Sequence, residues 1–95
     1  MRYLMRVEHS ETSTQGPIYL RGFDHEANLG TGHALLTHDP EQALGFSSPE
    51  QARAFWERTN SRGRTPLKAL SVELVSLQVA KLIYTNRSKT LSKYR

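Results

Sequence analysis

The side chains that could take part in acid–base or metal chemistry are mainly histidines, of which the chain has four: His9, His25, His33 and His38. No two of them lie four residues apart on a predicted helix, the spacing at which two imidazoles can share one metal ion. All four fall in predicted loops or at strand ends, where we expect them to be exposed. The chain has no cysteine, which excludes thiolate ligands, thiol nucleophiles and disulfides. The sequence therefore predicts neither a metal site nor a cofactor.

Hydrolytic and nucleotide-binding chemistry also lack their sequence patterns. A nucleophilic serine needs a strained turn or a helix start that faces a base, and we find no such surroundings at Ser10, Ser13, Ser47 or Ser48. The one Gly-x-Gly segment, Gly30-Thr31-Gly32, lacks a third glycine and precedes a strand pattern, where a phosphate-binding loop would lead into a helix. We therefore predict that the protein is not an enzyme.

A group of basic residues between positions 53 and 68 is the best candidate for a binding surface. We call it the basic ridge, and its members are Arg53, Arg58, Arg62, Arg64 and Lys68. Such a ridge could contact phosphates, which gives affinity without sequence readout, or it could anchor a partner protein, where arginine is favoured. Because Glu57 is interleaved with these residues, an ordinary solvated helix face remains the alternative.

The net charge of +4 is concentrated at the C-terminal end of the chain. Residues 81–95 carry five bases and no acid, whereas residues 1–80 carry eight bases and nine acids. The body is thus nearly neutral, and the basic character belongs to a tail. We expect residues 85–95 to be mobile and to supply secondary partner contacts through Arg87, Lys89, Lys93 and Arg95.

The elements that must position these residues begin with four strands. Apolar and polar residues alternate with a period of two at about residues 2–9, 17–23, 33–37 and 68–77. Residues 24–32 predict an exposed loop in which Asn28, Gly30 and Gly32 adopt positive φ. Residues 79–84 remain apolar, and their periodicity does not decide between an extension of the last strand and a short helix.

Two helix starts are marked by a repeated phrase, Asp39-Pro40-Glu41-Gln42-Ala43 and Ser48-Pro49-Glu50-Gln51-Ala52. Each combines an N-cap residue, a proline at the first helical position, an acid in the first turn and a glutamine that completes a capping box. Gly45 predicts that the first helix is a single turn. The second should end near Asn60, with Phe55 and Trp56 as its core anchors.

The predicted fold is a single α+β domain over residues 1–84, followed by the basic tail at residues 85–95. Its small antiparallel sheet has about four strands, in the order β-β-β-α-α-β, and one main helix packs on one face. The N-terminus places charges inside its only apolar run, unlike a signal peptide, and no run approaches the roughly 18 apolar residues of a membrane span. We therefore expect a cytoplasmic protein without membrane contact.

Several segments resemble small uncharacterised proteins of phages and prophages. The similarity covers residues 2–77 and rests on Tyr3-Leu4, Glu8-His9-Ser10, Gly16-Pro17-Ile18-Tyr19-Leu20, Gly22-Phe23-Asp24, residues 37–46, Phe55-Trp56 and Thr65-Pro66-Leu67. The resemblance implies a context and no activity, since small cysteine-free phage proteins include inhibitors of host machinery, anti-CRISPR proteins among them.

We expect a non-enzymatic binding protein of a phage or mobile element that inhibits a host-defence complex, a protein or a ribonucleoprotein, by protein–protein contact in the host bacterial cell. The alternative is a nucleic-acid-binding accessory protein that uses the basic ridge and the tail. Salt dependence separates the two, because counterion release makes affinity for nucleic acid fall steeply with salt.

Overall fold

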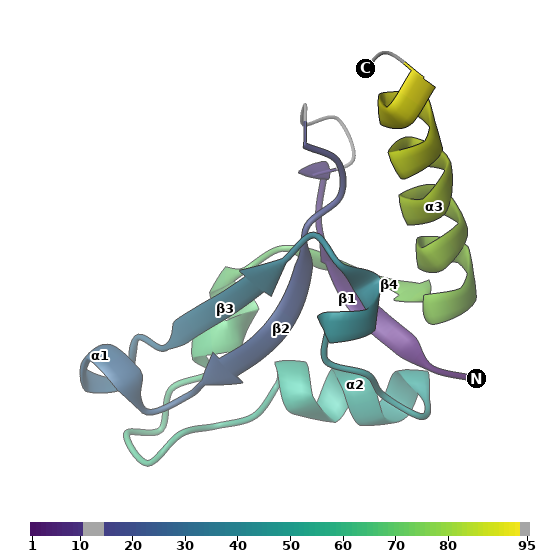
Figure 1. Ribbon diagram of the computed structural model, residues 1–95. Coiled ribbons are helices and arrows are strands. Elements are labelled where there is room, and N and C mark those ends of the chain that lie inside the picture. The colour runs from purple at the N-terminus through teal and green to yellow at the C-terminus, as the bar shows by residue number, and fades with distance from the viewer. Residues whose placement is uncertain (11–14, 94–95) are drawn as a thin grey trace.

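Four antiparallel strands form one sheet with the spatial order β3-β2-β1-β4 (Figure 1). The computed structural model describes residues 1–10 and 15–93, with side chains as far as Thr85. The strands are β1 Tyr3–Val7, β2 Tyr19–Asp24, β3 His33–Thr37 and β4 Val72–Ser76. The predicted α+β class with a four-stranded antiparallel sheet is confirmed. The last strand begins later than predicted, because Pro66 starts a 3-10 turn, η3 (Pro66–Ala69).

One face of the sheet is covered by the helix α2 (Pro49–Trp56). The buried residues between them are Met5, Leu20, Phe46, Ala52 and Leu67, with Phe55 and Trp56 packed against this cluster. The predicted cap is present, since Ser48 Oγ accepts from the main-chain nitrogen of Gln51 at 3.1 Å. Gln51 Oε1 in turn accepts from the main-chain nitrogen of Ser47 at 2.7 Å. The two hydrogen bonds close the start of α2 much as in a capping box, with the glutamine bonded to the residue before the N-cap.

α2 ends at Trp56, one turn before the predicted end near Asn60. The main-chain nitrogen of Arg58 bonds to the oxygen of Phe55, which tightens the last turn. The chain then turns inward, and Asn60 is only 7% exposed. The side chain of Asn60 bonds to main-chain groups outside the helix, as described below.

The opposite face of the sheet carries a second buried cluster made of Leu4, Tyr19, Ala43 and Ala80. It is covered by the single turn η2 (Pro40–Gln42), which was predicted, and by the start of the helix α3 (Leu77–Lys93). The side chain of Asp39 caps η2 by accepting from the nitrogen of Glu41. The sequence predicted a helix on one face only, because β1 reads as a half-buried strand, yet Leu4 and Met5 on its two faces are both buried.

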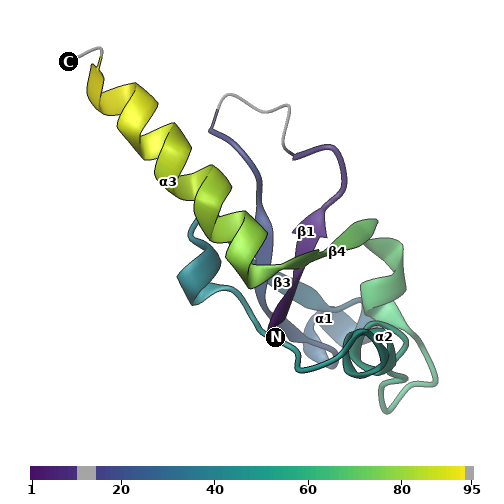
Figure 2. The same cartoon turned by 90° about the vertical axis from the view of Figure 1, so that its right-hand side faces the viewer.

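Residues 79–84, for which the sequence left a strand extension and a short helix open, belong to the helix α3. Ser76 Oγ accepts from the nitrogen of Val79 at 3.2 Å and caps the helix start. The helix continues through Lys93, so residues 85–93 have a regular secondary structure that was not predicted. Figures 1 and 2 show α3 leaving the sheet and projecting away from it. Tyr94 and Arg95 lie outside the described residues, and the predicted mobility of the tail stays a prediction.

The segment between β2 and β3 was predicted as a loop and contains a short turn, α1 (Ala27–Gly30). Its backbone is left-handed at Asn28 and Leu29, with φ of 55° and 59°. Positive φ was predicted for Asn28, Gly30 and Gly32, and all three adopt it, whereas Leu29 was not expected to. Leucine rarely adopts this conformation, and the side chain of Leu29 is 74% exposed.

Candidate functional site

The loop that follows α2 is organised around the side chain of Asn60. Its Nδ2 donates to the main-chain oxygens of His25 and Gly30, both at 2.9 Å. Its Oδ1 accepts from the main-chain nitrogens of Arg62 and Arg64 at 2.9 and 3.0 Å. One buried amide thus ties the loop to itself and to the α1 segment. Because buried polar groups are costly when unsatisfied, this arrangement fixes the loop conformation.

A second contact joins the same two segments. The carboxylate of Glu26 accepts from the main-chain nitrogen of Ser61 at 2.9 Å and from its hydroxyl at 2.6 Å. These two hydrogen bonds lower the pKa of Glu26 below its ordinary value of 4.5, with a smaller contribution from the nearby guanidinium of Arg58. The carboxylate is therefore an ionised acceptor near neutral pH and holds the start of the loop.

Three members of the basic ridge belong to this loop or to the turn before it: Arg58, Arg62 and Arg64. All three are exposed. The aliphatic stem of Arg62 lies over Gly30, since a Cβ added at Gly30 would come within 2.7 Å of Arg62 Cδ. In the described part of the chain, ion pairs within 4.0 Å involve none of these three arginines. Their guanidinium groups are presented to solvent from a fixed backbone.

The other two members of the basic ridge lie beside Trp56. The ammonium of Lys68 sits 5.4 Å from the centre of the Trp56 ring, within the range of a cation–π contact. Arg53 pairs with Glu57 at 3.1 Å, and the two side chains are 77% and 43% exposed. A pair this exposed contributes little to stability and is readily exchanged. The structure thus divides the predicted ridge into a loop part and a part that flanks Trp56.

Arg53 and Trp56 also line a groove of about 250 Å³ between α2 and β4. The remaining walls are apolar, formed by Met5, Pro49, Ala52, Val72 and Leu74. The indole nitrogen of Trp56 donates to the main-chain oxygen of Leu70 at 3.3 Å, which fixes the orientation of this ring in the groove wall. No sequence pattern predicted this groove, because its walls come from three separate segments.

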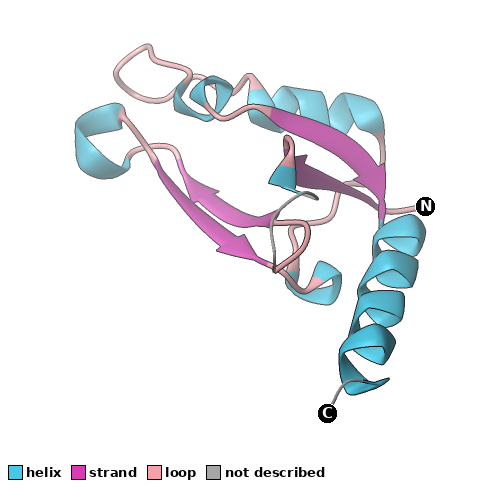
Figure 3. Cartoon of the chain, turned by 90° about the horizontal axis from the view of Figure 1, so that it is seen from above, coloured by secondary structure: helices cyan, strands magenta, loops and turns pink. Residues whose placement is uncertain are grey.

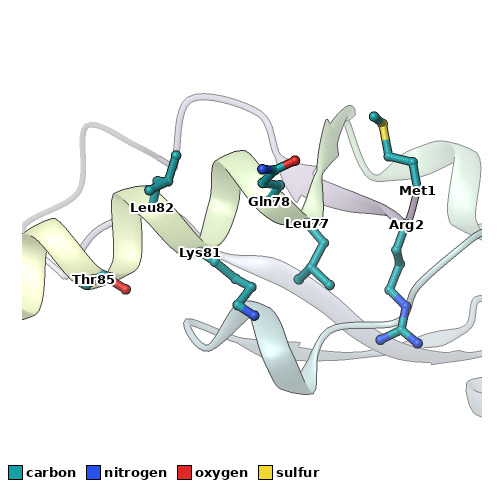
Figure 4. A pocket seen from close by; sticks show the side chains of 7 residues that line it. All are labelled: Met1, Arg2, Leu77, Gln78, Lys81, Leu82 and Thr85. Carbon is teal, nitrogen blue, oxygen red and sulfur yellow. The ribbon is translucent and has the colours of Figure 1, made fainter.

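A wider hollow of about 720 Å³ lies between the N-terminus and α3 (Figure 4). Its lining includes the basic residues Arg2 and Lys81 together with Leu77 and Leu82. Lys81 is paired with Glu41 at 2.7 Å, which ties α3 to η2. The pairing also lowers the pKa of Glu41. The hollow is open to solvent and combines apolar walls with positive charge.

The four histidines do not come together, and no group of three or more potential ligands that could hold a metal occurs among the described residues. The prediction that all four are exposed holds for His9 and His33 and is wrong for His25, which is 4% exposed. His38 is half-buried, and its Nδ1 lies 3.1 Å from the main-chain oxygen of Pro17.

The ring of His25 packs edge-on against Phe23 and Phe55, and Nε2 lies 3.4 Å from the main-chain oxygen of Phe55. The contact with Phe55 on α2 joins residues 30 positions apart, so local sequence could not reveal the burial of His25.

The predicted tail contacts lie outside what the structure describes in atomic detail. The side chains of Arg87, Lys89 and Lys93 lie beyond the described side chains, and Arg95 lies outside the described residues altogether. None of the helices in the described part of the chain has the length and hydropathy to span a membrane.

Comparisons of this chain with protein-family models, with curated protein sequences and with solved structures found no match. The resemblance to phage and prophage proteins therefore stays a prediction.

Sequence reasoning found the arginines of the loop and missed the residues that position them. The sequence predicts Asn60 only as the end of a helix and places Glu26 in an exposed loop. The one available signal was the composition of residues 60–65, since an asparagine ahead of a glycine-containing loop often bonds to its own backbone. The partners at positions 25–30 are 30 or more residues away and leave no local trace.

Proposed function

We propose that this protein is a non-enzymatic binding protein that contacts a partner protein through the loop part of the basic ridge. The observation that carries the proposal is the Asn60 loop, whose side-chain amide bonds to Arg62 and Arg64 while anchoring them to the α1 segment. Binding through a preorganised loop loses little conformational freedom. Arginine is also enriched among the residues that dominate interface energies.

The partner that we propose is a host-defence complex, and the protein would act by occluding it. The resemblance to phage proteins supports this choice of partner. The physical basis would be a cluster of exposed guanidinium groups that meets an acidic surface, since such complementarity favours specificity and fast association.

The proposal is tested by reversing single charges. The chain is used to capture its partner from a bacterial host lysate, and the affinity of the captured protein is then measured for Arg62→Glu, Arg64→Glu and the matched control Arg21→Glu. Arg21 is also exposed but lies on β2, away from the loop. We expect a loss of at least tenfold for the two loop variants and less than twofold for the control. Wild-type affinity in both loop variants would refute the assignment.

A second candidate function, nucleic-acid binding, is supported by α3. The sequence of this helix includes Lys81, Arg87, Lys89 and Lys93 and no acidic residue. A helix of this charge suits phosphate contacts, whose affinity falls steeply as salt rises. Tight, salt-sensitive binding to a 20-base-pair DNA or a 20-nucleotide RNA, with no protein recovered from lysate, would favour this function over the first.

A further inference from the structure

β4 is an edge strand whose outward-facing backbone groups follow from its register with β1. Two hydrogen bonds bracket the pair, from Glu8 nitrogen to Ser71 oxygen at 3.0 Å and from Leu77 nitrogen to Arg2 oxygen at 2.8 Å. In an antiparallel ladder, hydrogen-bonded pairs alternate with pairs whose backbone groups point away from each other. The residues of β4 whose backbone N–H and C=O groups point away from β1 are therefore Val72, Leu74 and Ser76.

No strand lies beyond β4 in the described part of the chain, so the N–H and C=O groups of Val72 and Leu74 face the open edge of the sheet. Figure 3 shows from above that the strand leading into the C-terminal helix is the outermost on its side. Natural edge strands are commonly guarded by an outward charge or a proline. β4 has neither at this edge, because its one charged residue, Glu73, is paired with Arg6 on the neighbouring strand at 2.8 Å.

The groove between α2 and β4 runs beside this edge. Figure 2 shows α2 end-on below β4. Leu74 lies directly opposite Met5 in the register, so both side chains are on the α2 face of the sheet. Met5 forms the floor of the groove together with Ala52, whereas Leu74 is 39% exposed at its rim. An open edge and an apolar groove therefore lie side by side.

We propose that this edge and groove bind an extended segment of a partner protein, which adds to the sheet as a fifth strand. In this mode the main chain of the bound segment pairs with the edge, and alternate side chains enter pockets. β4 has five residues, so the bound segment is about five residues long. Its alternate side chains are apolar and enter the groove.

The charge around the groove specifies the remaining chemistry of the segment. Arg53 lines the groove, and the ammonium of Lys68 lies over Trp56, which lines it too. We therefore expect the bound segment to carry an acidic residue that pairs with Arg53 in place of Glu57, which is the exposed partner of Arg53 in the free protein. A second copy of this chain is less suitable, because two-fold pairing of β4 with itself would bring two copies of Arg53 to one groove.

This inference is independent of the function proposed above. Arg62 and Arg64 do not line the groove, and the Asn60 loop is not part of the β4 edge. Arg62→Glu should therefore leave peptide binding unchanged, so the two proposals can fail separately.

The test begins with selection from a random nine-residue peptide library against the full-length chain, with counter-selection against Leu74→Lys. We expect enriched peptides to have apolar residues at alternate positions and an acidic neighbour. Leu74→Lys should weaken a selected peptide at least tenfold, and Arg53→Glu should weaken it several-fold, with recovery when the acid of the peptide is changed to lysine. Failure to enrich any peptide over the counter-selection would overturn the proposal.

Backbone pairing is tested on the same peptide. N-methylation of the peptide residues whose N–H groups pair with β4 should abolish binding. Methylation of the intervening residues, whose N–H groups point away from β4, should not. Amide exchange at Val72 and Leu74 should slow at least tenfold on binding, while exchange at Glu73 and Val75, already bonded to β1, should not change. Peptide binding that is unchanged by N-methylation at either set of residues would overturn the proposal. Slowed exchange at Val72 and Leu74 in a dimer without peptide would also overturn it, because the edge would then bind a second copy of this chain.

Discussion

The side-chain Nδ2 of Asn60 donates a hydrogen bond to the main-chain oxygen of His25, 35 residues earlier in the chain, at 2.9 Å. Through this contact the end of α2 and the segment after β2 hold each other in place. The same side chain also bonds to Gly30, Arg62 and Arg64. The surface that we propose for partner binding therefore depends on one buried amide.

Replacing Asn60 with alanine should destabilise the protein by about 2–4 kcal/mol. Four main-chain groups lose their hydrogen-bond partner, namely the carbonyls of His25 and Gly30 and the nitrogens of Arg62 and Arg64. Chemical denaturation measures the change. Thr59→Ala, at an exposed neighbouring position, should change the free energy of unfolding by less than about 0.5 kcal/mol. Equal stability of Asn60→Ala and wild type would mean that the loop is not held by this side chain.

Asn60→Asp separates the two halves of the interaction. Aspartate keeps an acceptor for the nitrogens of Arg62 and Arg64 but directs a second oxygen at the carbonyls of His25 and Gly30. We expect it to be as destabilising as alanine near neutral pH, and less so in acid, where a protonated carboxyl can donate to one carbonyl. Thermal midpoints measured at both pH values test this order.

The core on the α2 face of the sheet depends on Phe55. The centre of its ring lies 5.0 Å from the ring centre of His25 and 5.5 Å from that of Phe46. Phe55→Ala should lower the free energy of unfolding by about 2–4 kcal/mol, somewhat less than for a fully buried ring, because Phe55 is half-buried. Ser48→Ala, which removes only the cap of α2, should cost about 1 kcal/mol. An unchanged midpoint for Phe55→Ala would remove α2 from the core.

The fold was predictable where the deciding interactions are local. Alternation in β1 and the capping phrase at Ser48 each involve residues within a few positions, and both features are present. For α3 the sequence left strand and helix open at residues 79–84 and predicted no helix beyond them. The start of this helix depends on Ser76 and on burial of Ala80 against β1 and β2, and neither follows from the weak periodicity of residues 79–93. Helix formation here is decided by tertiary packing rather than by propensity.

The candidate site was predictable only in part, for the same reason. Arg58, Arg62 and Arg64 are close in sequence, so their proximity could be read directly. The groove brings together Met5, Ala52 and Leu74, which are separated by more than 20 residues at each step. Nothing in the local pattern of any one segment indicates such an arrangement, since it depends on the order in which the strands pair.

Two truncations test the role of α3. Deletion of residues 86–95 should leave cooperative unfolding intact, because Ala80 and Leu77, the residues of α3 that pack in the second cluster, are retained. Deletion from Leu77 onward should cost about 2–3 kcal/mol or more, since it uncovers Leu4 and Tyr19, now 0% and 2% exposed. If the shorter deletion also abolished cooperative unfolding, the last ten residues would be part of the folded core.

Glu26 gives the contact between the two segments a dependence on pH. Hydrogen bonds from Ser61 lower the pKa of its carboxyl below 4.5 in the folded protein, and no such bonds exist in the unfolded chain. A lowered folded-state pKa means that the contribution to stability is fully present above pH 4.5 and is lost as the pH falls through the folded value. The difference in stability between wild type and Glu26→Gln should therefore be largest near neutral pH and shrink in acid.

An NMR titration of the Glu26 side-chain carboxyl carbon measures this pKa directly. Ser61→Ala should raise the value towards 4.5, because it removes the hydroxyl donor, which is the largest cause of the shift. Arg58→Gln should raise it less, because the guanidinium acts only through its charge and at an exposed site. If Ser61→Ala left the titration unchanged and Arg58→Gln moved it, the shift would be electrostatic, and the hydroxyl of Ser61 would have no part in holding the loop.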